Sequence, residues 1–263
     1  MGTIYLGTIA SLGAGLATAV GALPILFTAQ LSRRWQRILL GLGAGVMLAA
    51  TAFSLIIPGK EAAGELGYSQ TESALIVSLG MLVGGSMLWL MNNYFPHEHF
   101  QHHHHFQQTP EGPVSKNFER LWLFVIAITI HNFPEGLAVG VGFGDGSLSH
   151  GLPLALGIGL QNMPEGLVVA LAIRELGYSV NYALGVSLLT GLVEPIGGAI
   201  GASIVNVGQF FLPWGMAIAA GSMLFVIVDE IIPEIDRESI AQEGTLSIMT
   251  GFVTMMFLDI AFG

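Results

Sequence analysis

Apolar runs of about 20 residues recur along the whole chain, separated by short stretches of polar residues, glycine and proline. A helix of this length spans the hydrocarbon core of a bilayer. The pattern predicts an all-α, polytopic membrane protein with eight transmembrane helices, and we expect residues 1–263 to form a single transmembrane domain. The expected helices cover residues 3–29, 38–58, 73–94, 119–142, 151–173, 181–207, 210–232 and 245–262.

The composition also favours a lipid environment and excludes several classes of protein. Hydrophobic residues make up 52% of the chain, charged residues make up 10%, and the mean hydropathy is +0.70. Soluble domains carry about 25% charged residues. The formal charge of −10 leaves no basic surface for nucleic acid, and the absence of cysteine excludes disulfides and thiolate metal sites.

The Lys and Arg residues fall almost entirely on one side of the predicted helices. Lys60, in the loop after the second helix, is the cation expected on the opposite side. Because basic loops stay in the cytoplasm, we expect both termini outside it, in a multi-pass protein of a bacterial inner membrane. The cations expected on the cytoplasmic side are Arg33, Arg34, Arg37, Lys116, Arg120, Arg174 and Arg237.

A polar motif occurs twice inside predicted transmembrane helices. Residues 131–136 read His-Asn-Phe-Pro-Glu-Gly, and residues 161–166 read Gln-Asn-Met-Pro-Glu-Gly. A charged group at mid-bilayer costs about 3 kcal/mol or more, so a repeated one needs a partner or a function. The fourth and fifth predicted helices carry the motifs and run antiparallel, which gives an inverted repeat of the kind that surrounds transporter binding sites.

The spacing within each motif favours metal binding. His131 and Glu135 are separated by one helical turn, as are Gln161 and Glu165, so each pair projects from one helix face. Imidazole nitrogen, carboxylate and amide oxygen together suit first-row divalent cations. Glu194, followed by proline in the sixth predicted helix, is a third intramembrane acid of the same group. The alternative is that these acids are hydrogen-bonded core groups that hold helices together.

Two further polar regions are candidates for metal contacts outside the membrane centre. Acids at the end of the seventh predicted helix are either a cation exit path or solvated helix-end groups; they are Asp229, Glu230 and Glu234. The loop at about 95–118 is either a cytoplasmic metal-collecting or sensing segment, or a linker with incidental metal affinity. Its histidines are His97, His99, His102, His103, His104 and His105.

On the paired motifs, the predicted helices and the His-bearing loop, the whole sequence resembles the ZIP family of metal transporters, and within it the GufA-like branch. The resemblance implies a helical bundle with inverted repeats that moves zinc, cadmium, iron or manganese into the cytoplasm. It implies no prosthetic group. A homodimer, which the resemblance to the family also suggests, is compatible with the glycine-rich helix surfaces.

The resemblance further implies roles for individual residues. One metal site would consist of His131, Glu135, Gln161 and Glu165. A second site would share both glutamates and add Asn132, Asn162 and Glu194. Some members have aspartate in place of Asn162, so the second site here carries one negative charge less. Some also have histidine in place of Asp229, so the exit ligands here differ from theirs. Glu230 matches an acid on the release side.

Two other classes of function stay open. A metal-gated channel or sensor would bind the same cations, but its flux would not saturate at micromolar metal. An intramembrane metalloenzyme would also place His and Glu at mid-depth, yet the sequence has no H-E-x-x-H motif and no obvious general base beyond the metal ligands. We therefore expect a protein that is not an enzyme.

Overall fold

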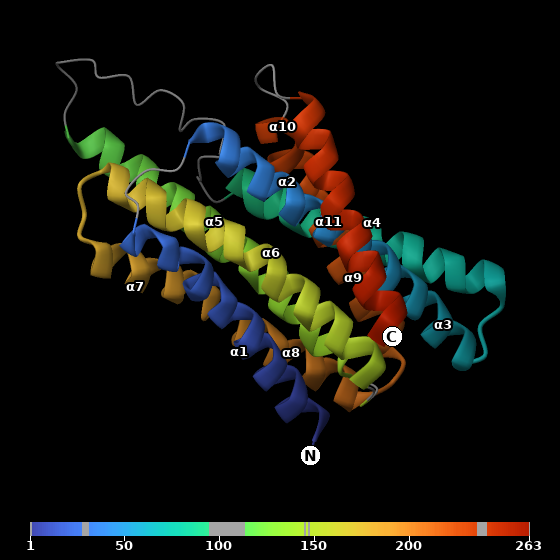
Figure 1. The fold of residues 1–263 in the computed structure, drawn as a ribbon. Coiled ribbons are helices and arrows are strands. Elements are labelled where there is room, and N and C mark those ends of the chain that lie inside the picture. Colours follow the sequence, from blue (N-terminus) through green and yellow to red (C-terminus); the bar gives the residue numbers. More distant parts are fainter. Residues whose placement is uncertain are drawn as a thin grey trace.

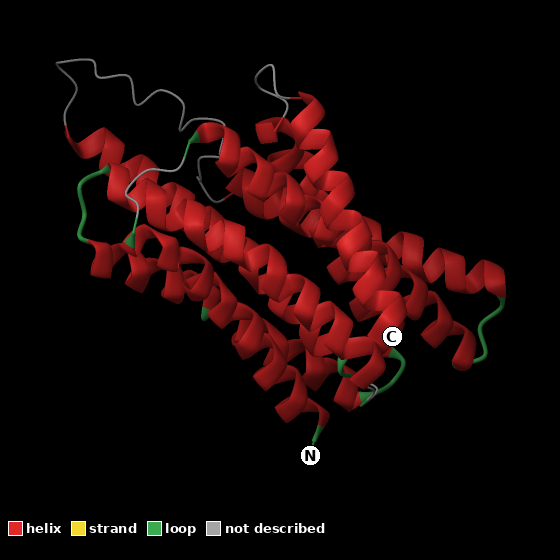
Figure 2. Cartoon of the chain, viewed as in Figure 1, coloured by secondary structure: helices red, strands yellow, loops and turns green. Residues whose placement is uncertain are grey.

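The computed structural model describes residues 2–27, 32–94, 114–144, 146, 148–235 and 241–262, and this part of the chain is helical with no strand (Figures 1 and 2). The all-α prediction is confirmed. The α-helices are α1 (Thr3–Ala22), α2 (Arg33–Ala49), α3 (Ile57–Glu65), α4 (Gln70–Tyr94), α5 (Val114–Gly142), α6 (Leu148–Glu175), α7 (Val180–Gly191), α8 (Glu194–Val207), α9 (Phe211–Val226), α10 (Ile232–Ile235) and α11 (Ala241–Phe262). A 3-10 turn, η1 (Leu23–Leu26), and two π-helical segments, η2 (Ala50–Ile56) and η4 (Ile227–Ile231), extend or join them.

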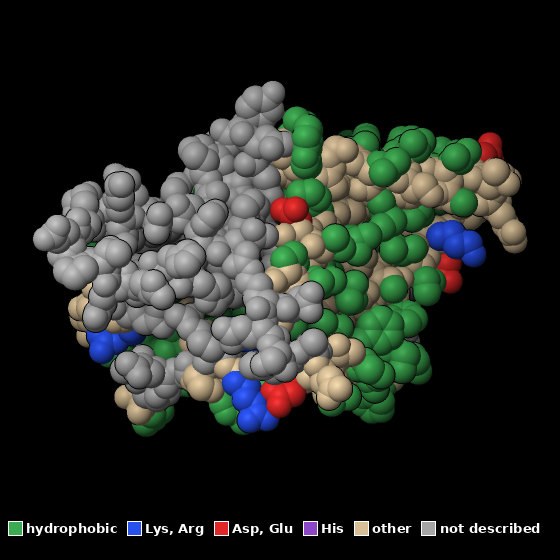
Figure 3. All heavy atoms as spheres, turned by 90° about the horizontal axis from the view of Figure 1, so that it is seen from above, with side chains coloured by type: hydrophobic (Ala, Val, Ile, Leu, Met, Phe, Trp, Pro, Cys, Tyr) green, Lys and Arg blue, Asp and Glu red, His purple; other side chains and the backbone are tan. Residues whose placement is uncertain are grey.

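Seven helical segments of the described chain are long and apolar enough to cross a membrane. They are Thr3–Leu26, Arg34–Glu65, Gln70–Met91, Gly151–Arg174, Val180–Val207, Phe211–Asp229 and Gln242–Ala261. Helix α5 is not among them, so the count of eight stays a prediction. Hydrophobic side chains are spread over the described surface in Figure 3, and Leu82 and Phe257 are 67% and 64% exposed, which suits contact with lipid.

The second predicted helix is longer than its apolar run. The chain is helical from Arg33 through η2 to Glu65, so Lys60 lies in α3, and its placement in a loop is wrong. Pro58 lies where the π-helical segment η2 passes into α3, and it donates no backbone hydrogen bond there. The hydropathy pattern marks only the part of a helix that crosses the lipid. This helix continues past its apolar run into more polar residues.

The sixth predicted span is confirmed as Val180–Val207, but it consists of two helices and not of one continuous helix. Helix α7 ends at Gly191, and α8 begins at Glu194 with Pro195 in its first turn. Proline cannot donate a backbone hydrogen bond and clashes with the preceding turn, so a new helix begins here. The break places Glu194 at the start of α8, deep in the protein, where it is fully buried.

The helices pack in two groups, which are visible side by side in Figure 1. The first group consists of α1, α5, α6, α7 and α8. The second consists of α2, α3, α4, α9 and α11. Contacts of α6 with α2 and of α5 with α9 join the groups. Both copies of the polar motif and Glu194 therefore belong to the first group.

Two pairs of helices, α2 with α11 and α9 with α4, cross closely at glycine residues in the same way. A methyl group built on Gly45 of α2 would strike the backbone carbonyl of Ile248 on α11, and one built on Gly221 of α9 would strike that of Met81 on α4. Small residues allow such close approach of membrane helices. The α2–α11 crossing thus has a counterpart in the α9–α4 crossing, which supports an internal repeat that extends beyond the two motifs.

An exposed ion pair joins the beginnings of α2 and α11. Arg34 Nε and Nη2 lie 2.8 and 2.5 Å from the two carboxylate oxygens of Glu243, and the side chains are 64% and 36% exposed. Water screens such pairs strongly. We expect Arg34→Ala to lower the midpoint of thermal unfolding in detergent by less than about 3 °C. A larger fall in the midpoint, matched by Glu243→Ala, would mean that this ion pair contributes substantially to the stability of the fold.

Candidate metal site

The seven residues predicted for the metal site are all buried within the first helix group. Their exposed fractions range from 0% to 8%. Helix α5 supplies three of them, α6 supplies three, and α8 supplies one. They are His131, Asn132, Glu135, Gln161, Asn162, Glu165 and Glu194. Such a concentration of polar groups in an apolar bundle needs internal partners or a polar ligand.

A hydrogen bond joins the two motifs directly. Gln161 Nε2 on α6 donates to Glu135 Oε1 on α5 at 2.6 Å. The structure therefore brings together the first residue of one motif and the acid of the other, as expected for an inverted pair. The bond holds one carboxylate oxygen of Glu135 and leaves the second, Oε2, without a hydrogen-bond partner among the described protein atoms.

Asn162 connects α6 to two other helices. Its Nδ2 donates to Glu194 Oε1 on α8 at 2.7 Å and to the carbonyl oxygen of Ala14 on α1 at 2.9 Å. Glu194 Oε2 and Asn162 Oδ1 have no hydrogen-bond partner among the described protein atoms. As in the Glu135–Gln161 pair, an amide group orients a carboxylate and both residues keep one free acceptor oxygen.

The free oxygens distinguish the site from a satisfied polar core. A buried polar atom without a partner costs about 1–3 kcal/mol, so most proteins avoid it. In this cluster, five residues each have one buried oxygen without a hydrogen-bond partner among the described protein atoms. They are Asn132, Gln161 and Asn162 through their amide oxygens, and Glu135 and Glu194 through Oε2. Acceptor oxygens of this kind are ligands for divalent cations.

The three acids interact electrostatically with one another. Glu135 is close enough to Glu165 and Glu194 for their charges to repel when ionised. A divalent cation would relieve this repulsion. Among the described residues, however, no three His, Asp or Glu side chains lie close enough to hold an ion alone. Any ion bound in this arrangement therefore needs amide ligands, or a movement of the helices, in addition to the acids.

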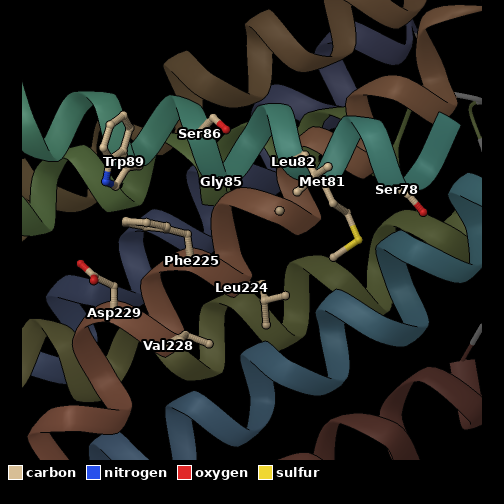
Figure 4. A pocket seen from close by; sticks show the side chains of 11 residues that line it. Ser78, Met81, Leu82, Gly85, Ser86, Trp89, Leu224, Phe225, Val228 and Asp229 are labelled. Carbon is tan, nitrogen blue, oxygen red and sulfur yellow. The ribbon is translucent and has the colours of Figure 1, made fainter. Parts of the chain in front are cut away.

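The predicted exit acids do not join this cluster as far as the structure describes them. Asp229 is exposed and lines a largely apolar groove between α4 and α9, beside Trp89 and Phe225 (Figure 4). The side chains of Glu230 and Glu234 lie outside the described part of the structure, and so do all six histidines of the 95–118 loop. Their proposed roles stay predictions.

Sequence reasoning missed two contributions from α1. The carbonyl of Ala14 accepts a hydrogen bond from Asn162, and Thr18 is 1% exposed with a hydroxyl that has no partner among the described atoms. Neither residue carries a sequence signal, because a threonine in an apolar helix usually bonds back to its own turn. Only the packing of α1 against α6, α7 and α8 brings the Ala14 carbonyl to Asn162 and places Thr18 beside Gly166 and Gly191.

Together, the apolar spans and the buried carboxylate and amide cluster define a polytopic membrane protein with a polar centre. Within that class, the chain belongs to the ZIP family, because the family model described as "ZIP Zinc transporter" matches residues 94–259. The family resemblance that the two motifs indicated is thus confirmed.

Individual relatives align with almost the whole chain. The chain is 45% identical to zinc transporter GufA of Myxococcus xanthus, over 98% of this chain and 99% of that protein. It is 42% identical to zinc transporter ZIPB of Bordetella bronchiseptica, over 94% and 78%. It is 31% identical to human zinc transporter ZIP11, over 94% of each. These identities place the chain near the GufA-like members of the family.

Proposed function

We propose that this protein transports divalent transition-metal cations, with zinc as the main cargo, through the buried cluster between α5, α6 and α8. The observation that carries the proposal is the set of buried oxygens without partners, which a cation would satisfy. Membership of the ZIP family and relatives named as zinc transporters support the same conclusion. Cadmium, iron and manganese are expected as weaker or alternative cargo.

The residues of the cluster have different roles in binding the cation. Glu135, Glu165 and Glu194 supply the negative charge that replaces part of the hydration shell of the cation. Gln161 and Asn162 orient two of these carboxylates by hydrogen bonds of 2.6 and 2.7 Å. His131 supplies a nitrogen ligand and Asn132 an amide oxygen. These weaker ligands allow the cation to leave again, as transport requires.

We further propose uptake into the cytoplasm, with both termini outside and the protein in a bacterial inner membrane. The basic residues support this orientation. Asp229, Glu230 and Glu234 would receive the cation at the cytoplasmic end, and the histidine loop would collect it. The chain would act as one transporter domain, and a homodimer is consistent with its glycine-rich helices.

The test is zinc uptake by proteoliposomes that contain the purified protein, beside liposomes without it. We expect uptake that saturates at roughly 1 μM–1 mM zinc and that cadmium inhibits. Uptake equal to that of the empty liposomes would contradict the transporter proposal. Protein-dependent flux that rises linearly without saturation would favour the metal-gated channel instead.

A further inference from the structure

The contacts of α1 with α6 and of α8 with α5 are inverted copies of each other. A methyl group on Gly166 would strike the backbone of Thr18, and one on Gly136 would strike the backbone of Glu194. Gly136 and Gly166 are the last residues of the two motifs. If they correspond, Thr18 on α1 corresponds to Glu194 on α8.

A second set of contacts leads to the same correspondence. Gly15 and Gly191 approach each other through their backbones. A Cβ on Gly15 would lie 3.3 Å from Glu194 Oε1, and a Cβ on Gly191 would lie 2.8 Å from Thr18 Oγ1. The hydroxyl of Thr18 therefore occupies, relative to Gly191, the place that the carboxylate of Glu194 occupies relative to Gly15.

The two inverted sets of contacts differ in the hydrogen bonds of their polar side chains. Asn162 donates to Glu194 and to Ala14, but neither polar side-chain atom of Asn132, its counterpart in the other motif, has a hydrogen-bond partner within the described part of the protein. Thr18 Oγ1 likewise has no partner among the described atoms. Asn132 and Thr18 are each 1% exposed. A threonine side chain is two carbons shorter than glutamate, which explains why Asn132 is not held as Asn162 is.

We propose that Thr18 and Asn132 form an uncharged subsite that binds the transported divalent cation, opposite the charged half formed by Asn162 and Glu194. The inference rests on the proposed transport function and adds Thr18 to the residues that handle the cargo. A hydroxyl and an amide oxygen are neutral ligands, so this half binds the cation weakly and leaves part of its water shell in place. Weak binding on one side lets the cation pass to or from the strongly charged side without being trapped.

Thr18→Val tests the subsite because valine keeps the shape and β-branching of threonine and removes only the hydroxyl. We expect the KM for zinc uptake by proteoliposomes to rise about fivefold to tenfold. Thr18→Ser, which keeps the hydroxyl, is expected to stay within about twofold of the wild type. Elution profile and thermal midpoint in detergent should be unchanged in both variants.

The outcomes separate this inference from the transport proposal. Saturable wild-type uptake with an unchanged KM in Thr18→Val would overturn the subsite alone, and so would a serine variant as impaired as the valine variant, because packing would then explain both. No saturable wild-type uptake would overturn the transport proposal and the subsite with it.

A double-mutant cycle tests whether Thr18 and Asn132 act together. If both groups bind the same cation, Thr18→Val combined with Asn132→Ala should raise the KM by less than the product of the two single increases. Independent effects, which multiply, would overturn the shared subsite.

Discussion

Glu135→Gln is expected to reduce saturable zinc uptake by more than about 100-fold, which corresponds to about 2.8 kcal/mol. Glutamine has the size of glutamate and can still pair with Gln161, so the change removes a buried negative charge with little change in packing. An ion dehydrated in a low-dielectric site depends on that charge far more than on a surface one. Initial uptake rates over a range of zinc concentrations measure the loss.

Glu61→Gln is the matched control, because Glu61 is an exposed acid on α3, outside the cluster. The same neutralisation there should leave the uptake rate within about twofold of the wild type, since exposed charges are screened. If Glu135→Gln elutes as a folded protein and retains full uptake, Glu135 is a structural carboxyl and the cation takes another path. Glu135→Asp should fall between the two, because the shorter side chain weakens the 2.6 Å contact with Gln161.

The polar cluster was the most predictable part of the molecule. Charged and amide side chains are so costly in lipid that a repeated set of them stands out in an apolar sequence. Spacing of one helical turn then predicted that His131 and Glu135 share a helix face, and both are buried, at 4% and 1% exposure. Their burial is confirmed, whereas their binding of metal stays a prediction.

Features that depend on packing between helices could not be predicted from the sequence. The partner of Gln161 is Glu135, but which residues meet depends on how α5 and α6 rotate against each other. The position of Thr18 depends likewise on the close contact of α1 with Gly166 and Gly191. The break before Glu194 was predictable in principle, because Pro195 follows it, yet the continuous apolar run concealed it.

Gly15→Val is expected to prevent stable packing of α1 against α7, and to abolish uptake with it. Any Cβ at Gly15 would strike the backbone of Gly191, so either helix must move, and the side chain of Glu194 lies beside the same point. Overpacking of this kind costs about 1–3 kcal/mol or more. We expect the thermal midpoint in detergent to fall by more than about 5 °C.

Gly13→Val separates this steric effect from the general effect of valine in a helix. Gly13 lies on the same helix, is exposed, and has no atom of another element within 4 Å of where its Cβ would be. Valine there should face lipid and leave both the thermal midpoint and zinc uptake close to those of the wild type. Equal behaviour of the two variants would mean that α1 does not cross α7 at Gly15, and the correspondence of Thr18 with Glu194 would lose its geometric basis.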